Sequence, residues 1–202
     1  MSLIAKKKPS VPPIEAGTYI SVCVGVVDLG TQYSEAFKKS DHKVMIIFEI
    51  PSVTVEVDGE IKPRWLSQQY SVSLNEKSNL YKTLTSWRGR ALTAEELSMG
   101  FDISAMIGQG CMIQITVEEG SDGGQYNKLN SVIGLPAGVP VPQLQNPAIK
   151  FDMDAWDDEV FKSMPDWIQD KVRKSQEYEE MHAEVKRVAF DTPQDAQGAC
   201  PI

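Results

Sequence analysis

Apolar and polar residues alternate along much of the first two thirds of this chain, with the two-residue period of β-strands. The segments that show this pattern, or that are rich in β-branched and aromatic residues, are 17–27, 43–57, 64–74, 108–117 and 125–135. Within 43–57 one face carries Val44, Ile46, Phe48 and Ile50. Pro51 predicts a bulge there, because proline cannot donate a ladder hydrogen bond. The pattern therefore predicts five strands, the second and third joined by a hairpin turn at Asp58-Gly59.

A helix is predicted over 75–90, between the third and fourth strands. Leu80, Leu84 and Trp87 recur at spacings of four and three residues, which is the stripe of a helix that packs on a core. We expect Asn75 to be its N-cap. Thr93 and Glu96 form a capping-box pattern that begins a second, short helix.

Three strands, a helix and two strands follow one another in the order of an OB-fold. This is a small Greek-key barrel whose outer face and loops bind oligonucleotides or oligosaccharides. We therefore expect a mainly β protein: a five-stranded OB-fold-like barrel over residues 14–136, with a helix between strands 3 and 4.

Four segments flank the predicted barrel. Residues 1–13 contain three lysines and three prolines and are expected to form a flexible basic arm. Residues 137–150 are predicted to be a proline-rich linker. Residues 151–187 predict two acidic helices, the second beginning at Pro165, and 188–202 predict a disordered tail. The predicted fold is thus a β-barrel followed by an acidic α-helical C-terminal extension.

Composition narrows the class of protein. The 202 residues are 42% hydrophobic and 24% charged, as in ordinary soluble globular proteins. No apolar run approaches the roughly 20 residues that span a bilayer, and no apolar stretch follows the basic N-terminus as a secretory signal would require. Cys23, Cys111 and Cys200 form no C-x-x-C pair, so we expect reduced thiols, the first two in the core. These features predict a cytoplasmic protein and no membrane; the resemblance described below implies that the cytoplasm is that of a bacterial host.

The net charge of −8 is unevenly distributed. Residues 1–150 contain 14 Lys/Arg and 15 Asp/Glu, whereas residues 151–202 contain 6 and 13. A pI of 4.8 argues against a polyanionic ligand for the chain as a whole. It does not argue against such a ligand for the nearly neutral first part.

No pattern of residues indicates catalysis. His42 and His182 have neither a neighbouring nucleophile nor metal-ligand spacing. The acidic cluster between Asp152 and Glu159 is typical of a solvated helix face. The glycine-rich run 120–124 joins two strands, so it is not a phosphate loop. We expect no enzyme, no cofactor and no metal.

A nucleic-acid surface is better supported, since single strands bind to aromatic platforms flanked by cations. In an OB-fold the ligand crosses strands 2 and 3 between the loops that join strands 1–2 and 4–5. Three segments offer suitable side chains at these places. The candidate binding residues are Tyr33, Phe37, Lys38, Lys39, Lys43, Arg64, Trp65, Tyr126 and Lys128. Trp65 on a sheet face could equally be a core residue, and Tyr126 could be a residue of the barrel rim.

The residue pattern also resembles a known group of sequences. The runs 73–80 (SLNEKSNL), 86–90 (SWRGR) and 93–97 (TAEEL), with 17–19 (GTY), 27–30 (VDLG) and 48–51 (FEIP), resemble an uncharacterised family of small bacteriophage and prophage proteins. The likeness covers about residues 12–180. Members of that family look like OB-fold single-stranded-DNA-binding proteins of phage replication and recombination modules. The resemblance implies DNA binding but assigns no binding residue.

Our leading hypothesis is non-sequence-specific binding of single-stranded DNA, by base stacking and phosphate contacts, during phage DNA replication or recombination. Because one groove covers few nucleotides, a homo-oligomer is left open. The alternative is a protein-interaction module, an adaptor or inhibitor of a host protein. The acidic helices could bind such a partner through Trp156, Phe161, Trp167, Ile168 and Val172. They could instead pack on the barrel, or compete with DNA for its basic groove. Bacterial single-stranded-DNA-binding proteins recruit partners through an acidic tip closed by an aromatic residue, whereas this chain ends Ala199-Cys200-Pro201-Ile202.

Overall fold

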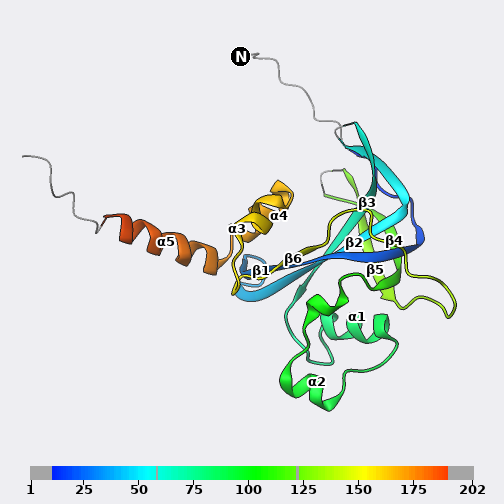
Figure 1. Ribbon diagram of the computed structural model, residues 1–202, viewed down its shortest axis with the longest axis horizontal. Coiled ribbons are helices and arrows are strands. Elements are labelled where there is room, and N and C mark those ends of the chain that lie inside the picture. Colours follow the sequence, from blue (N-terminus) through cyan, green and yellow to red (C-terminus); the bar gives the residue numbers. More distant parts are fainter. Residues whose placement is uncertain (1–10, 58, 122, 191–202) are drawn as a thin grey trace, which may run out of the picture.

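The computed structural model describes residues 11–57, 59–121 and 123–190 (Figure 1). Its strands are β1 (Gly17–Ser34), β2 (Lys39–Val57), β3 (Glu60–Ser71), β4 (Gly110–Glu119), β5 (Gln125–Ile133) and β6 (Ile149–Phe151). Its helices are α1 (Asn79–Arg88), α2 (Ala94–Met99), a 3-10 turn (Ile103–Met106), α3 (Asp158–Ser163), α4 (Asp166–Val172) and α5 (Gln176–Phe190). Most of the predicted basic arm, the tail 191–202 with Cys200, and Asp58 of the predicted turn lie outside the described residues.

The long strand β1 organises the sheet because it pairs with three other strands. Gly17–Val22 pairs antiparallel with β4, Val22–Ser34 pairs antiparallel with β2, and Gly25–Val27 pairs parallel with β6. The strand order is β3-β2-β1-β4-β5. No ladder joins β3 to β5 in the described part of the chain, so the sheet is not closed into a barrel. The mainly β class and the helix between the third and fourth strands are confirmed, whereas a closed barrel is not.

The β1–β2 hairpin is longer than the sequence predicts. The predicted strands 17–27 and 43–57 imply a polar loop over 28–41, but the ladder continues from Asp28↔Val44 to Ser34↔Lys39, which leaves only residues 35–38 in the turn. The loop prediction was wrong because polar composition alone does not end a strand whose backbone is paired on a hairpin. Farther along β2 the predicted bulge at Pro51 is confirmed by a register shift between Ile50 and Thr54.

Helix α1 covers one face of the sheet, and its side chains complete the first core. Leu80, Leu84 and Trp87 are buried as the stripe predicts, and the Trp87 indole N–H donates to the Gly110 carbonyl over 2.9 Å. The N-cap is Ser78 rather than Asn75, because the Ser78 hydroxyl accepts the Tyr81 N–H. Cys23 and Cys111 are buried free thiols of the same core, also as predicted. We call the sheet face that points into this core the inner face.

A second core lies on the opposite, outer face of β1 and β2. The sheet contributes Val24, Val27, Leu29, Met45 and Ile47. The C-terminal region contributes Ile149, Phe151, Met153, Phe161, Met164, Ile168 and Val172. All twelve side chains are buried. The C-terminal region up to α4 therefore packs on the sheet as part of the folded unit.

This packing revises the predicted layout of the C-terminal region. The last residues of the predicted linker belong to strand β6. The structure has three helices, α3, α4 and α5, where the sequence predicts two, and they are separated by breaks at residues 164–165 and 173–175. The start of α5 is fixed to β1, since the Glu177 carboxylate accepts from the Thr31 N–H (2.7 Å) and hydroxyl (2.6 Å). Beyond that contact α5 projects from the body (Figure 1). Among the described helices, none combines the length and apolar character needed to cross a membrane.

Candidate nucleic-acid interface

The end of the β1–β2 hairpin presents two aromatic rings to solvent. Tyr33, near the end of β1, is 55% exposed, and Phe37 in the turn is 76% exposed. Lys38 follows with a φ of +49°, the left-handed conformation that lets the four-residue turn close. A single exposed ring is ordinary, whereas apolar surface gathered at one place marks an interaction site. The hairpin end therefore presents two exposed aromatic rings and a basic side chain on the surface.

Two lysines at the base of the hairpin share one carboxylate. Asp41 lies 3.1 Å from the Lys39 Nζ and 3.5 Å from the Lys43 Nζ. The hydrogen bond from Lys39 lowers the pKa of Asp41 below its usual range. Lys43 also donates to the Ser71 hydroxyl over 2.6 Å. Lys38, by contrast, makes no ion pair with any described residue, so its charge is available to a ligand.

On β3 the two candidate residues do not share a face. Cross-strand pairing sets Arg64 opposite Ile50, a residue of the first core, and Trp65 opposite Glu49 on the outer face. The Arg64 guanidinium donates to the Pro12 carbonyl over 2.5 Å, and burial lowers its pKa. Adjacent strand residues point to opposite faces, so these two side chains cannot form one groove.

Trp65 is partly buried by the protein itself. Its ring packs against the second core together with Leu144, and its indole N–H is buried without a hydrogen-bond partner among the described residues. Next to it, the fully buried Glu49 carboxylate accepts from the backbone N–H groups of Gln145 (2.8 Å) and Asn146 (3.1 Å). The segment that follows β5 thus lies over this part of the sheet and contacts Glu49.

The remaining candidates lie on β5. Tyr126 is 48% exposed, its hydroxyl donates to Glu118 over 3.1 Å, and Lys128 lies 2.7 Å from the same carboxylate. Glu118 raises the pKa of both Tyr126 and Lys128. The β4–β5 hairpin lies beside the start of β1, where Gly17 pairs with Ile115. The β1–β2 hairpin lies at the opposite end of β1, where Ser34 pairs with Lys39. The nine candidates therefore occupy separate places. The β1–β2 hairpin differs from the β5 pair in that Lys38 has no ion-pair partner among the described residues, whereas Lys128 pairs with Glu118.

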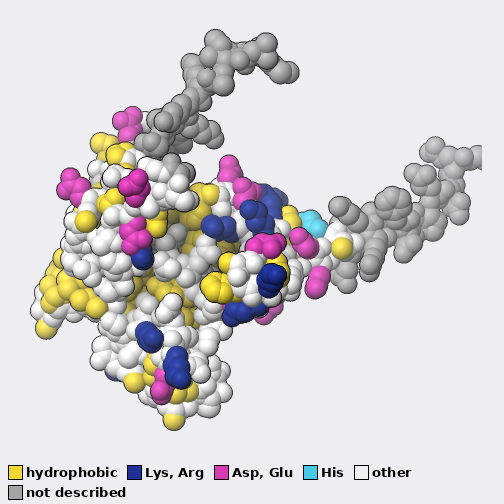
Figure 2. Space-filling view, turned by 180° about the vertical axis from the view of Figure 1, so that it is seen from behind, with side chains coloured by type: hydrophobic (Ala, Val, Ile, Leu, Met, Phe, Trp, Pro, Cys, Tyr) yellow, Lys and Arg dark blue, Asp and Glu magenta, His cyan; other side chains and the backbone are white. Residues whose placement is uncertain are grey.

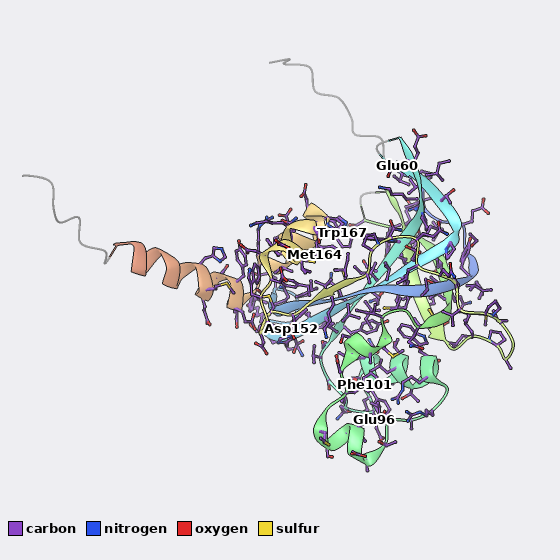
Figure 3. All side chains as sticks on the ribbon, in the orientation of Figure 1. Glu60, Glu96, Phe101, Asp152, Met164 and Trp167 are labelled. Atoms are coloured by element: carbon purple, nitrogen blue, oxygen red, sulfur yellow. The ribbon has the colours of Figure 1, made fainter. Side chains whose placement is uncertain are left out.

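A cleft of about 690 Å³ opens beside the end of α1, between Arg88, Arg90, Phe101 and Leu135. Both guanidinium groups contact one carboxylate, that of Glu96. Arg88 pairs with Glu96 and lies 4.7 Å from the centre of the Phe101 ring, and Arg90 lies 3.4 Å from the same carboxylate. Hydrogen bonds from Arg88 and from the Thr93 N–H lower the pKa of Glu96 to about 2. Glu96 and Phe101 lie together in this lower part of the molecule, away from Met164 and Trp167 (Figure 3). The guanidinium groups hold α2 against α1.

The acidic cluster before α3 serves as caps and turns. Asp157 accepts from the N–H groups of Glu159 and Val160, Asp152 accepts from the Asp154 N–H, and Asp158 accepts from the Trp156 indole. Among the residues that the structure describes, no group of three or more metal-ligating side chains is placed to hold an ion. The cluster is explained by helix capping.

No protein-family model matches this chain, and a comparison with curated proteins gives no significant match. The functional inference therefore depends on where the exposed aromatic and basic side chains lie.

Proposed function

We propose that this protein binds single-stranded DNA without sequence preference, with bases stacked on Tyr33 and Phe37 of the β1–β2 hairpin. The supporting observation is the exposure of both rings at one hairpin end, beside Lys38, which has no ion-pair partner in the described part of the chain. Base stacking on aromatic side chains tolerates any sequence, because every base has a π-face. The resemblance to phage proteins suggests DNA replication or recombination as the process.

We also propose that the open sheet is a divergent OB-fold. Its strand order β3-β2-β1-β4-β5, its long β1 shared between β2 and β4, and its helix between β3 and β4 agree with that topology. OB-folds are partly open barrels, and their loop between strands 1 and 2 is a principal ligand contact. The β1–β2 hairpin is that loop here, so topology and exposure favour the same site.

In this proposal DNA does not cross the outer face of β1 and β2. That face carries five buried apolar side chains under the C-terminal region, and Trp65 packs beside them. Stacking is assigned to the hairpin rings, whereas Tyr126 and Lys128 belong to a separate surface.

Fluorescence anisotropy with labelled oligo-dT tests the proposal. Each stacked base contributes about 1–3 kcal/mol, so Phe37→Ala and Tyr33→Ala should each weaken binding by roughly five-fold to a hundredfold. Ile61→Ala is the matched control, because Ile61 is 77% exposed on another hairpin. Wild-type affinity should fall linearly with salt on a log–log scale. Absence of wild-type binding at low salt would contradict the proposal.

The alternative, a protein-interaction module acting through the acidic helices, retains few of its anchors. Phe161, Ile168 and Val172 are buried in the second core, and Trp156 packs against it. Trp167 on α4 remains 45% exposed, and α5 projects from the body. A partner would have to bind these two features alone.

A further inference from the structure

The junction between α4 and α5 lies directly beside the β1–β2 hairpin. The Gln32 side-chain amide donates to the backbone carbonyls of Leu29 (2.6 Å) and Lys171 (3.0 Å), and so ties the end of α4 to β1. The Gln176 side chain donates to the Ser40 hydroxyl over 3.0 Å, on the other strand of the hairpin. Both strands of the hairpin therefore contact this junction.

The junction is basic although the region around it is acidic. It contains Lys171, Arg173 and Lys174 within four residues. Arg173 is occupied by Asp170 at 2.9 Å and by the Gln169 side chain at 2.8 Å. Lys171 and Lys174 form no ion pair within the described part of the chain. Figure 2 shows Lys and Arg side chains gathered where the C-terminal helices lie on the body, with acidic side chains among them.

Several carboxylates near the hairpin are already engaged, whereas Glu35 in the turn forms no ion pair with a described residue. Asp41 binds Lys39 and Lys43, and Asp28 lies 2.7 Å from the His42 ring. Glu177 accepts two hydrogen bonds from Thr31. The hairpin and the junction therefore offer lysines without a carboxylate partner among the described residues, namely Lys38, Lys171 and Lys174.

We infer that Lys171 and Lys174 are phosphate contacts of the same single-stranded-DNA interface, an inference that rests on the proposed function. Bases stack on the hairpin rings, and the backbone of the strand runs over the α4–α5 junction, where the two ammonium groups neutralise phosphates. Single-strand binding requires this combination of aromatic platform and cations. The acidic C-terminal region then contributes to DNA binding at this place, instead of competing with DNA.

The test is the salt dependence of oligo-dT binding by the full-length chain. Lys171→Ala/Lys174→Ala should weaken binding at moderate salt and reduce the log–log salt slope by about 0.7 for each phosphate that is no longer neutralised. The matched control is Lys77→Ala/Lys82→Ala, which changes the net charge equally. It removes two exposed lysines at α1 that have no ion-pair partner among the described residues. Thermal melts verify that both variants remain folded.

The outcomes separate this inference from the function itself. If wild-type protein does not bind oligo-dT, the proposed function fails. If it binds, and Phe37→Ala weakens that binding, but the Lys171/Lys174 variant matches the Lys77/Lys82 control in affinity and slope, the phosphate contacts are wrong and the function stands. A reduced slope only in the junction variant supports the inference, and Glu35→Gln should then strengthen binding by removing the opposing charge.

Discussion

At the scale of single residues, Glu49 is a fully buried acidic group of the sheet. Its carboxylate is fully buried and accepts three N–H donors, two from the backbone of Gln145 and Asn146 and one from the Asn146 side chain at 2.6 Å. Charge-assisted bonds of this kind are stronger than neutral ones. Glu49 thus fastens the segment after β5 to the outer face of the sheet.

Glu49→Gln should destabilise the protein by about 1–3 kcal/mol, because an amide group that faces N–H donors leaves a buried donor unpaired. The measurement is the free energy of unfolding in urea. Glu118→Gln serves as the control, since Glu118 is 38% exposed in its side chain and such surface pairs contribute about 0–1 kcal/mol. Equal unfolding midpoints for the two variants would show that Glu49 does not hold the segment.

The same region shows what the sequence could predict at this scale and what it could not. Strand alternation correctly predicted that Val44, Ile46, Phe48 and Ile50 of β2 share one face, which is the inner one. It could not show that Trp65 packs on a second core, because the residues of that core that follow β5 begin near Leu144, distant in sequence. A strand pattern reports which face a side chain takes, not what packs on that face.

At the scale of elements, the sequence contains an indication of the second core in two uninterrupted apolar runs. Residues 22–27 and 44–48 are apolar without interruption, apart from Gly25, whereas a strand with one wet face alternates. Burial of Val24, Met45 and Ile47 on the outer face accounts for the run. A continuous run indicates cover on both faces, and the acidic helices were the remaining element able to supply it. The residue pattern of the helices alone leaves open whether Phe161, Ile168 and Val172 bind a partner or pack on the sheet, and the continuous strand runs favour packing.

Docking of α5 on β1 depends on Gly30. Its φ is +64°, and a Cβ there would lie 2.6 Å from the Glu177 carboxylate and 2.7 Å from the Ser175 Cβ. Gly30→Ala should therefore release the start of α5, on top of a backbone cost of about 1–2 kcal/mol. Gly89→Ala is the matched control, because Gly89 has a φ of +67° and open space around it.

Hydrogen exchange of the amides around Thr31 and Tyr178 measures this release directly. We expect faster exchange in Gly30→Ala than in Gly89→Ala, since only the first substitution disturbs the bonds between Thr31 and Glu177. Similar exchange in both variants would mean that α5 docks without the space that Gly30 provides.

At the scale of the whole molecule, the order of strands and helix could be predicted because it depends on local periodicity. Closure of the sheet could not be predicted from the sequence. It depends on whether β3 and β5 come close enough to pair, and no local pattern encodes the distance between them. The division into a barrel and a separate extension also required long-range information. Strands β1, β2 and β6 and helices α3 and α4 share the second core, so the described part of the chain up to α4 folds as one unit.

Deletion of residues 149–202 should therefore unfold the protein. It removes seven buried apolar side chains and uncovers five on the sheet. At about 1.5–3 kcal/mol for each buried side chain, the loss is on the order of 10 kcal/mol or more, comparable with the whole stability of a typical domain. Circular dichroism melts and binding of a hydrophobic dye measure the effect, and deletion of 191–202 alone is the control. A truncated chain that still melts cooperatively near the wild-type temperature would show that the sheet is stable without its outer cover. In that case the C-terminal region would be a separable extension after all.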